Sequence, residues 1–498
     1  MAISTAVDAS AVARVVGIKT KFINTKVGGV TILPQRVAII GQGATASTYA
    51  TTKAVVTSAK EVGDAYGYGS PVHLAALQLL PQNGDGIGSI PLTIYPLLDD
   101  GAGVAAAGDI TPSGTVTKAG TFRILLSGIQ SSQFTIAVGD NVAAIITKMI
   151  AAVNGVLNMP AIAANGTTKL NLTAKWKGLT GNDIVIAVSG PTDTGVTFAI
   201  TQPTAGAANP SVTTALDQIG SVWETLIVNC LNIDDSTALD AYSTFGEGRW
   251  GALIRKPLLV FTGHKKLTPQ LITAITDTRK TDRINVALAN PGSVTLPFVS
   301  AAGIVSRIAT LANNNPACDY GRQAASYIEP GADGAQWDYT QRNTAVAGGA
   351  STVEVRDGVV TVSDTVTMYH PTGEEPPAYR FVCDVVKLMN IIFNIDLQFN
   401  NAEWDGAPLI PDDQPTVNPA AKKPKNARAV LKVLAESLGQ NALISDISYS
   451  QDNTQCEIDS SNPKRLNTVF PVKLSGNVNI HSIDLNFGFY FGTSTATV

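Results

Sequence analysis

The alternation of apolar strand-like segments with helix-like segments between residues 225 and 311 is the feature that most limits the possible folds. The strand-like segments are Thr225–Leu231, Leu258–Thr262 and Arg283–Leu288. A stretch with helical spacing of apolar residues follows each one, starting at Asp235-Ser236, at Thr268-Pro269 and near Pro297. Strand–helix repeats of this length favour right-handed crossovers, so they predict a partly parallel sheet. Arg36–Ile40 is apolar on both faces, as expected for a strand covered on both sides.

A second constraint is an inserted module bracketed by two Gly/Ala-rich stretches, DDGAGVAAAGD at 99–109 and QPTAGAANP at 202–210. Both read as flexible linkers, and an insertion between linkers is typical of a peripheral domain. Between them we expect short strands and one helix, capped by Asp140 and apolar on one face from Val142 to Val153. At 498 residues the chain is also too long for a single core.

The predicted fold class is therefore a multi-domain, mixed α+β and α/β fold with an inserted β-rich domain. The expected parts are an extended N-terminal arm (1–35), a first core segment (36–99), the insertion (100–208), an α/β core segment (209–350), a C-terminal domain (351–478) and an extended C-terminal arm (479–498).

The last part of the C-terminal sequence, 469–491, reads as one long strand with an unusual pattern. From Val472 to Ile480 the apolar residues have even numbers, and from Ile483 to Phe491 they have odd numbers. Because strand side chains alternate with period two, the buried face must change at His481-Ser482. One interpretation is a bulge or bend within a single domain. The other is that the strand leaves its own domain and pairs with a neighbouring subunit.

Charged residues make up only 15% of the chain, and the net charge is −4. Few charges on a soluble protein suggest a surface covered by partners, although an ordinary neutral surface on a Thr/Ala-rich β protein is the simpler alternative. The net charge offers no general attraction to nucleic acid, and no apolar run is long enough to span a membrane. We therefore expect neither nucleic-acid binding nor membrane insertion.

The best enzyme-like motif is Gly41-x-Gly43-x-x-Ala46 after an apolar strand, which fits a dinucleotide fingerprint on paper. A cofactor site would also need a helix that begins at once and an acidic residue at the end of the next strand. Thr45–Tyr49 is a poor helix start, and Glu61 lies in a helix-like or loop-like segment. A simple strand-to-loop turn is the favoured interpretation, and a nucleotide-binding α/β enzyme remains the rival.

No other catalytic or metal-binding pattern emerges, so we predict no enzyme, no cofactor and no metal. The histidines His73, His264, His370 and His481 lack ligand spacing, and Lys265-Lys266 beside His264 suggests an exposed turn. The cysteines Cys230, Cys318, Cys383 and Cys456 lie far apart, which predicts buried thiols of a protein made in a reducing cytoplasm. Asn83–Gly86 and Asp234-Asp235 are better explained as a turn and a helix cap than as cation sites.

One basic cluster precedes and enters an amphipathic helix expected at Asn426–Leu438. Its members are Lys422, Lys423, Lys425, Arg428 and Lys432. A solvated helix start is the simple interpretation, and an electrostatic contact with an acidic partner is the functional one.

Five stretches, in this order, resemble the tail sheath proteins of Mu-like contractile phages. They are PQRVAIIGQGATAST (34–48), GYGSPVHLAALQLLPQN (67–83), LNLTAKWKGLTGNDIVIAV (170–188), VEVRDGVVTVSDTVTMYHPTGEEPPAYRFVCDVVKLM (353–389) and SNPKRLNTVFPVKLSGNVNIHSIDLNFGFYF (461–491). Each alone is weakly specific, but together they span nearly the full length.

The resemblance implies a sheath subunit that polymerises around a tail tube as a six-fold helical homo-oligomer and contracts to drive the tube through the host envelope. It implies that 351–478 is the inner sheath domain, that both terminal arms contact neighbouring subunits, and that the basic cluster faces the tube. The implied contact residues are Val12, Val15, Val16 and Ile18 in the N-terminal arm, and Ile483, Leu485, Phe487, Phe489 and Phe491 in the C-terminal arm. Tube, baseplate and tail terminator proteins are the implied partners, in a virion assembled in the host cytoplasm. Another virion shell or tube protein is the further alternative.

Overall fold

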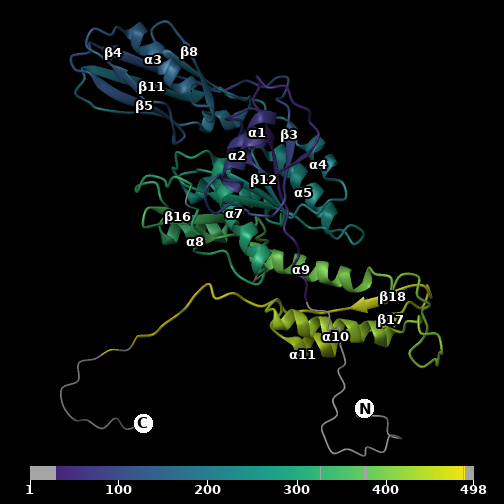
Figure 1. Cartoon of the computed structure of the whole chain (residues 1–498). Helices are drawn as coiled ribbons and strands as arrows, with labels where there is room; N and C mark the ends of the chain where they lie inside the picture. The colour runs from purple at the N-terminus through teal and green to yellow at the C-terminus, as the bar shows by residue number, and fades with distance from the viewer. Residues whose placement is uncertain (1–29, 326, 375–377, 486, 488–498) are drawn as a thin grey trace, which may run out of the picture. The chain divides into compact units, whose positions relative to one another are not determined.

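The computed structural model describes residues 30–325, 327–374, 378–485 and 487 (Figure 1). These residues form two compact units. The large unit holds 32–393 and the described residues from 475 onward, and the small unit holds 30–31 and 394–474.

The large unit is built on an eight-stranded sheet with the strand order β16-β15-β14-β13-β12-β1-β3-β2. Its strands are β1 (Val37–Gln42), β2 (Ala54–Val56), β3 (Leu92–Leu97), β12 (Leu226–Asn229), β13 (Leu259–His264), β14 (Asn285–Ala289), β15 (Ala350–Arg356) and β16 (Val359–Asp364). The pairs from β3 through β1, β12, β13 and β14 to β15 are parallel, while β2 and β16 pair antiparallel at the two edges. The predicted partly parallel sheet is confirmed.

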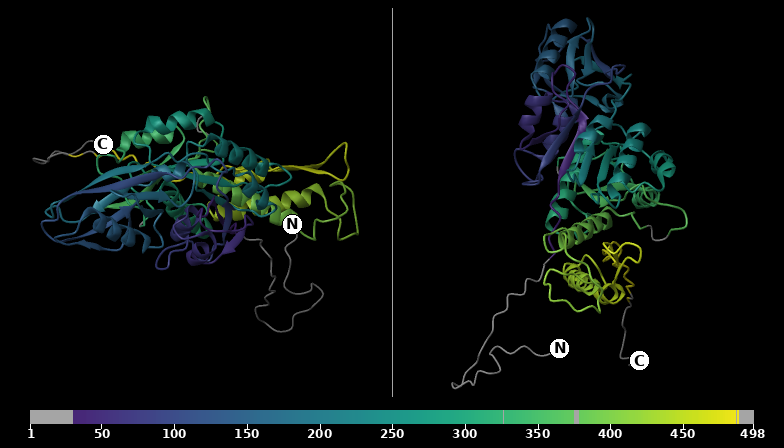
Figure 2. Two further views of the ribbon diagram at one scale, coloured as in Figure 1. Left: turned by 90° about the horizontal axis from the view of Figure 1, so that it is seen from above. Right: turned by 90° about the vertical axis from the view of Figure 1, so that its right-hand side faces the viewer.

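Helices cover both faces of this sheet, which explains why its central strands are apolar on both sides (Figure 1, Figure 2). Val37 and Ile39 of β1 belong to the core that includes α2 (Pro71–Leu79) and α7 (Pro297–Asn314). Ala38 and Ile40 point the other way, into the core shared with α4 (Thr213–Ile219) and α5 (Ser236–Trp250). The remaining helices of this part are α1 (Ala59–Tyr66), α6 (Pro269–Thr276), α8 (Tyr339–Ala347) and the 3-10 helix η2 (Asp277–Arg279).

The inserted module contains two four-stranded sheets, β10-β5-β6 with β7 on β5, and β11-β4-β9-β8. Its elements are β4 (Ala107–Gly114), β5 (Gly120–Leu126), β6 (Ile129–Gln130), β7 (Phe134–Ile136), α3 (Val142–Asn154), β8 (Ala161–Asn165), β9 (Leu170–Ala174), η1 (Leu179–Asp183), β10 (Ile186–Ser189) and β11 (Val196–Thr204). The expected helix is present, but Asn141 caps it by accepting from the amide of Ala144, while Asp140 accepts from the amide of Ala137.

The interpretation of the bracketing stretches as flexible linkers is wrong, because their ends pair with each other. Ala107 and Thr204 are partners in the β4–β11 ladder, and Val104 bridges Ala207. Asn209 also donates a 2.8 Å hydrogen bond to Asp235 of the α/β core. Small side chains suggested flexibility, but backbone hydrogen bonds between strands do not depend on side-chain size.

The small unit consists of helices α10 (Pro424–Gln440) and α11 (Ile447–Asn453) with a two-stranded antiparallel sheet, β17 (Gln455–Ile458) and β18 (Leu466–Val469). Helix α9 (Val382–Phe399) begins in the large unit and ends in the small one. From its sequence, 444–450 is expected to form a strand, but this prediction is wrong, because Asp446 caps α11 there by accepting from the amide of Tyr449.

Candidate assembly surfaces

The glycine-rich loop after β1 is filled by the side chains of its own fold. The hydroxyl of Tyr49 accepts from the amide of Gly43 at 3.0 Å and donates to the carbonyl of Leu97 at 2.9 Å. A Cβ atom added at Gly43 would collide with the Tyr49 ring. The next helix along the chain, α1, begins only at Ala59, so the loop does not lead directly into a helix as a dinucleotide fingerprint requires. The absence of a side chain at Gly43 lets the Tyr49 ring pack against the backbone. The glycine-rich motif that suggested nucleotide binding is therefore explained by packing within the fold.

The four histidines lie in different environments. His264, the last residue of β13, is 2% exposed, so the exposed turn expected there is wrong. Its Nδ1 accepts from the amide of Lys266, and burial lowers its pKa to about 3. Burial, with the charge of Lys175 nearby, also lowers the pKa of His73 to about 4. His481 is exposed on the C-terminal segment.

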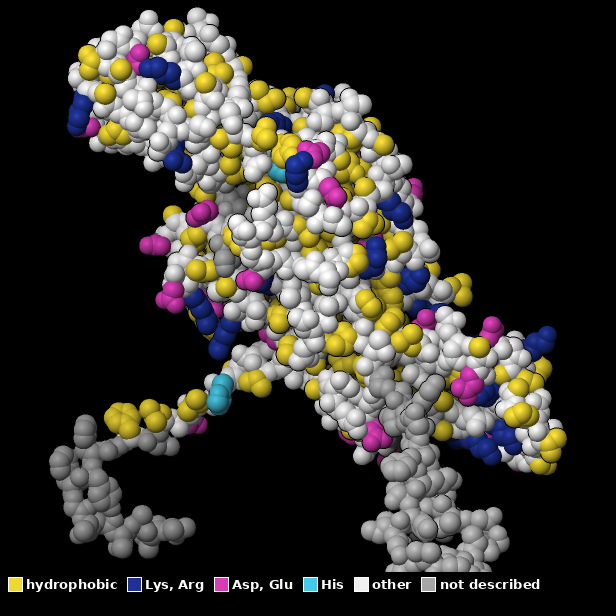
Figure 3. All heavy atoms as spheres, viewed as in Figure 1, with side chains coloured by type: hydrophobic (Ala, Val, Ile, Leu, Met, Phe, Trp, Pro, Cys, Tyr) yellow, Lys and Arg dark blue, Asp and Glu magenta, His cyan; other side chains and the backbone are white. Residues whose placement is uncertain are grey.

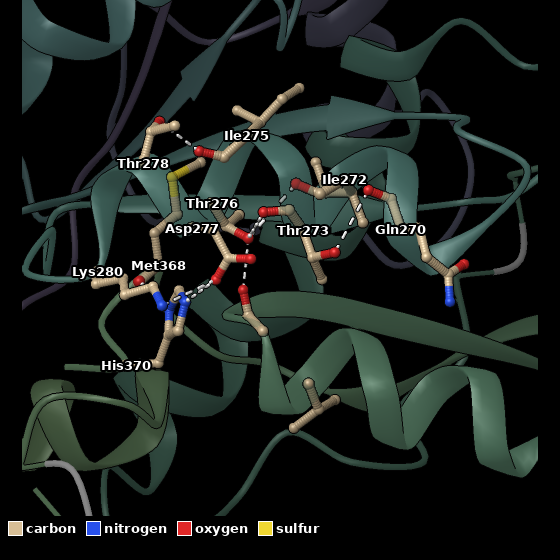
Figure 4. Close-up of polar contacts among 12 residues, drawn as sticks. Gln270, Ile272, Thr273, Ile275, Thr276, Asp277, Thr278, Lys280, Met368 and His370 are labelled. Atoms are coloured by element: carbon tan, nitrogen blue, oxygen red, sulfur yellow. Dashed lines mark hydrogen bonds and ion pairs between the residues drawn. The ribbon is translucent and has the colours of Figure 1, made fainter. Parts of the chain in front are cut away.

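His370 ties the loop after β16 to η2 (Figure 4). Its Nδ1 lies 2.7 Å from the carbonyl oxygen of Met368, and its Nε2 lies 3.1 Å from Oδ1 of Asp277. Both partners are acceptors, so the ring satisfies both when each nitrogen carries a proton. This hydrogen bond, followed by contributions from Lys280, lowers the pKa of Asp277. The geometry gives His370 a bracing role within the fold.

Two negative findings and one correction concern the described part of the chain. Nowhere in it do three or more His, Cys, Asp or Glu side chains gather as ligands could. Within the same residues, no helix has the length and hydropathy of a membrane-spanning segment. Of the cysteines, Cys230, Cys383 and Cys456 are buried as expected, but Cys318 is exposed, which corrects the prediction for that thiol.

The C-terminal segment carries a strip of exposed apolar side chains, visible in Figure 3. The exposed fractions are 89% for Val478, 82% for Ile480, 71% for Ile483, 80% for Leu485 and 85% for Phe487. We call these five residues the C-terminal strip. Within this chain, the described residues 470–485 do not form the long strand expected at 469–491, because β18 ends at Val469 and no strand follows it there. An apolar row without cover in one chain is the pattern of a surface that is buried in an assembly.

A buried lysine that the sequence analysis missed fixes the start of this strip. Lys387 of α9 is fully buried, and its Nζ donates to the carbonyl of Ser475 at 2.6 Å and to Oδ1 of Asn477 at 2.5 Å. Asp384, one turn earlier, lies 3.0 Å from the same nitrogen, and the Asn477 amide donates to the carbonyl of Ala317. The available signal was a single lysine within the apolar run VCDVVKLMN. These hydrogen bonds fix the position of the chain at Asn477, immediately before the exposed residues of the C-terminal strip.

The structure does not describe the remaining predicted contact residues of the two terminal arms. Val12, Val15, Val16 and Ile18 lie outside the described residues, as do Phe489 and Phe491.

The basic cluster is brought together, but acidic residues oppose much of its charge. Arg428 lies 2.5 Å from Asp412, and Lys422 pairs with Glu403. Three of the cations, Lys425, Arg428 and Lys432, share one face of α10 because they are spaced by three and four residues. We call these three the basic face. Both Lys425 and Lys432 are exposed, so part of the positive charge remains available to a partner.

Comparison with known proteins gives the family context. No family model matches the chain. The Mu-like prophage FluMu tail sheath protein of Haemophilus influenzae is 24% identical to it over 412 residues, which are 80% of this chain and 82% of that protein. The chain is a homologue of a Mu-like tail sheath protein. This finding confirms the resemblance seen in the five sequence stretches.

Solved sheath structures also align with the chain at low identity. The sheath tail protein of Listeria innocua aligns with 89% of this chain and 93% of its own, at 12% identity and a TM-score of 0.48. The sheath tail protein of Desulfitobacterium hafniense covers 92% of this chain and 100% of its own, at 14% identity and a TM-score of 0.44. A contracted sheath of the extracellular contractile injection system PVC covers 96% and 98%, at 8% identity and a TM-score of 0.49.

Proposed function

We propose that the chain is the subunit of a contractile tail sheath that polymerises around a tail tube and shortens to drive the tube through the host envelope. Homology to the Haemophilus influenzae sheath protein over 80% of the chain is the observation that carries this proposal. The low charge content and the uncovered apolar strip agree with it, since both suit a surface that partners bury. The site of action is the virion tail, after assembly in the host cytoplasm.

The cohesion of the sheath comes, in this proposal, from strand addition by the terminal arms of neighbouring copies. Each backbone hydrogen bond formed in this way contributes about 1 kcal/mol net. Burial of each large apolar side chain of the C-terminal strip adds about 1.5–3 kcal/mol. The apolar residues of the N-terminal arm, Val12 to Ile18, would contribute in the same manner. Attachment is therefore firm while the rest of each subunit stays free to move.

The basic face of α10, with Lys422 and Lys423 beside it, is the proposed contact with the tail tube. Exposed cations at a protein interface steer association and set register more than they add affinity. Baseplate and tail terminator proteins would bind the two ends of the six-fold helical polymer, where the terminal arms have no neighbouring copy to enter.

The decisive test changes the C-terminal strip without touching the folded units. Replacing Ile483 and Leu485 together by Asp should abolish the striated hollow cylinders that the parent chain forms in negative-stain electron microscopy. Loss of two buried side chains removes about 3–6 kcal/mol from each arm contact, which is more than a hundred-fold in the association constant. The melting temperature of the dispersed subunit should not change, because both side chains are exposed in it.

Asn479→Asp is the matched control, since it adds a charge to the same segment at an exposed polar position. It should assemble like the parent chain. Normal cylinders from the double variant would contradict arm donation, and a parent chain that never forms cylinders, with or without tail tubes, would contradict the sheath assignment itself.

A further inference from the structure

One cavity in the described part of the chain contains none of the residues assigned above to assembly surfaces. Its volume is about 1050 Å³, at the upper end of the size range of small-molecule sites. It lies between the start of α1, the C-terminal half of α2 and the loop 81–88, and Asn158 of the inserted module and Tyr327 complete its wall. We call it the Tyr68–Tyr327 groove. All of its lining residues belong to the large unit.

Two tyrosines give the groove its aromatic surface. Tyr68 packs edge to face on His73, with ring centroids 5.0 Å apart, and its hydroxyl donates to Asp64 at 2.7 Å. Tyr327 is 52% exposed, and its hydroxyl donates to the carbonyl of Asn83 at 2.8 Å. Both hydroxyl protons are thus already used. What the two rings still offer a ligand is mainly apolar surface.

Several polar side chains of the groove have unused hydrogen-bonding capacity. The imidazole of His73 is 1% exposed and accepts from the amide of Gly69 through Nδ1 at 3.1 Å. Its lowered pKa of about 4 keeps the ring neutral near pH 7, so the remaining proton is on Nε2, which has no acceptor among the described residues. The side-chain amides of Gln82, Asn83 and Asn158 make no hydrogen bonds within those residues either. Each amide can donate and accept at once.

The charges around the groove are compensated by each other. Lys60 lies 2.6 Å from Asp64, and Asp85 lies 3.8 Å from Arg307. With His73 neutral, no unopposed charge lines the wall. A charged ligand would find no counter-ion there, so the chemistry favours a neutral ligand that is rich in hydrogen-bonding groups.

From these features we infer that the Tyr68–Tyr327 groove binds a short neutral oligosaccharide. Sugar hydroxyl groups both donate and accept, which matches the free amides and the Nε2–H group of His73. Sugar rings also present faces of C–H groups, which pack on aromatic rings such as those of Tyr68 and Tyr327. This inference concerns one chain alone and does not depend on sheath assembly.

Isothermal titration of the dispersed full chain with tri-N-acetylchitotriose and maltotriose, both neutral, tests the inference. We expect saturable binding of at least one of them, and about ten-fold weaker binding after Asn158→Ala or Tyr327→Ala, the loss expected for one hydrogen-bonding or ring contact. Asn343→Ala and Tyr339→Ala change exposed residues of the same types on α8, outside the groove, and should leave the affinity unchanged. Melting temperatures show whether each variant is folded.

Three results would overturn the inference. One is no heat of binding with either sugar at millimolar concentration. Another is binding that Asn158→Ala and Tyr327→Ala leave intact. The third is tighter binding of a charged sugar or of an unmodified peptide than of both neutral trisaccharides, because the compensated wall was the reason to choose a neutral ligand.

Discussion

Acidification should destabilise the large unit through His264, whose ring is buried at the end of β13. In the unfolded chain a histidine has a pKa near 6.5, while burial holds the pKa of His264 at about 3. Between these values the unfolded state binds a proton that the folded state does not, so stability is fully present above pH 6.5 and falls as the pH drops. From pH 7 to pH 5 the loss is about 2 kcal/mol for this one residue. His73, with a folded pKa of about 4, adds a similar loss.

Urea unfolding at pH 7 and pH 5, followed by tryptophan fluorescence, measures the effect. Four of the five tryptophans, Trp176, Trp223, Trp250 and Trp337, report on the large unit. His264→Asn keeps an acceptor for the amide of Lys266 but cannot titrate. Its free energy of unfolding should therefore depend on pH less than that of the parent chain, by about 2 kcal/mol over this interval.

The exposed His481 supplies the control for this experiment, and His481→Asn should retain the full pH dependence of the parent chain. His73→Asn should reduce the dependence by about as much as His264→Asn, and the double variant by about the sum, because the two rings lie on separate elements. An unchanged pH dependence in His264→Asn would refute the reasoning, since it would mean that the buried ring gains its proton as easily in the folded state as in the unfolded one.

Three further outcomes are expected. Lys425→Glu combined with Lys432→Glu should impair polymerisation on tail tubes while the subunit stays folded. The control Lys118→Glu, at an exposed ion pair of the inserted module, should polymerise normally. Normal tube binding by the α10 variant would contradict the tube-facing assignment. Lys387→Met should release the chain from 475 onward, which would be measured as faster amide exchange there. Breaking a buried charged contact should lower the free energy of unfolding by about 3–5 kcal/mol. Unchanged exchange would show that the lysine does not hold this segment. Addition of ATP or NAD should leave the melting temperature unchanged, and a concentration-dependent rise would revive the nucleotide-binding rival.

The sequence was informative about the sheet because its central strands are buried on both faces. Runs such as Thr225–Leu231 are too short and too apolar for surface helices, and the crossover rule then makes the sheet parallel. A serine followed by proline predicts a helix start at Ser70-Pro71, with Ser70 as the N-cap. The structure confirms this, since the Ser70 hydroxyl accepts from the amide of His73. These features depend on neighbouring residues, so one sequence suffices to find them.

Features that depend on distant partners were missed. The end of the β4–β11 ladder, where Ala107 pairs with Thr204, consists of small side chains that give no periodic pattern. The glycine-rich loop was ambiguous until Tyr49 was seen to fill it. The apolar run around Lys387 hinted that it is buried, but its hydrogen-bond partners lie almost ninety residues away, so its role could not be read from neighbouring residues. The apolar row of the C-terminal strip is exposed in the single chain, and its contact with a neighbouring subunit stays a prediction.

The fixed point at Asn477 limits how far the C-terminal strip can reach. Phe487 follows it by ten residues, and a fully extended chain advances at most about 3.5 Å per residue, so in the proposed strand exchange the surface that receives Phe487 must lie within roughly 35 Å of Asn477. In the proposed sheath, a connecting segment of that length would allow two neighbouring subunits to rotate and slide past each other over tens of ångströms before the segment is fully extended. The position of the Lys387 ammonium group would thereby set how far two subunits can move before their connection breaks.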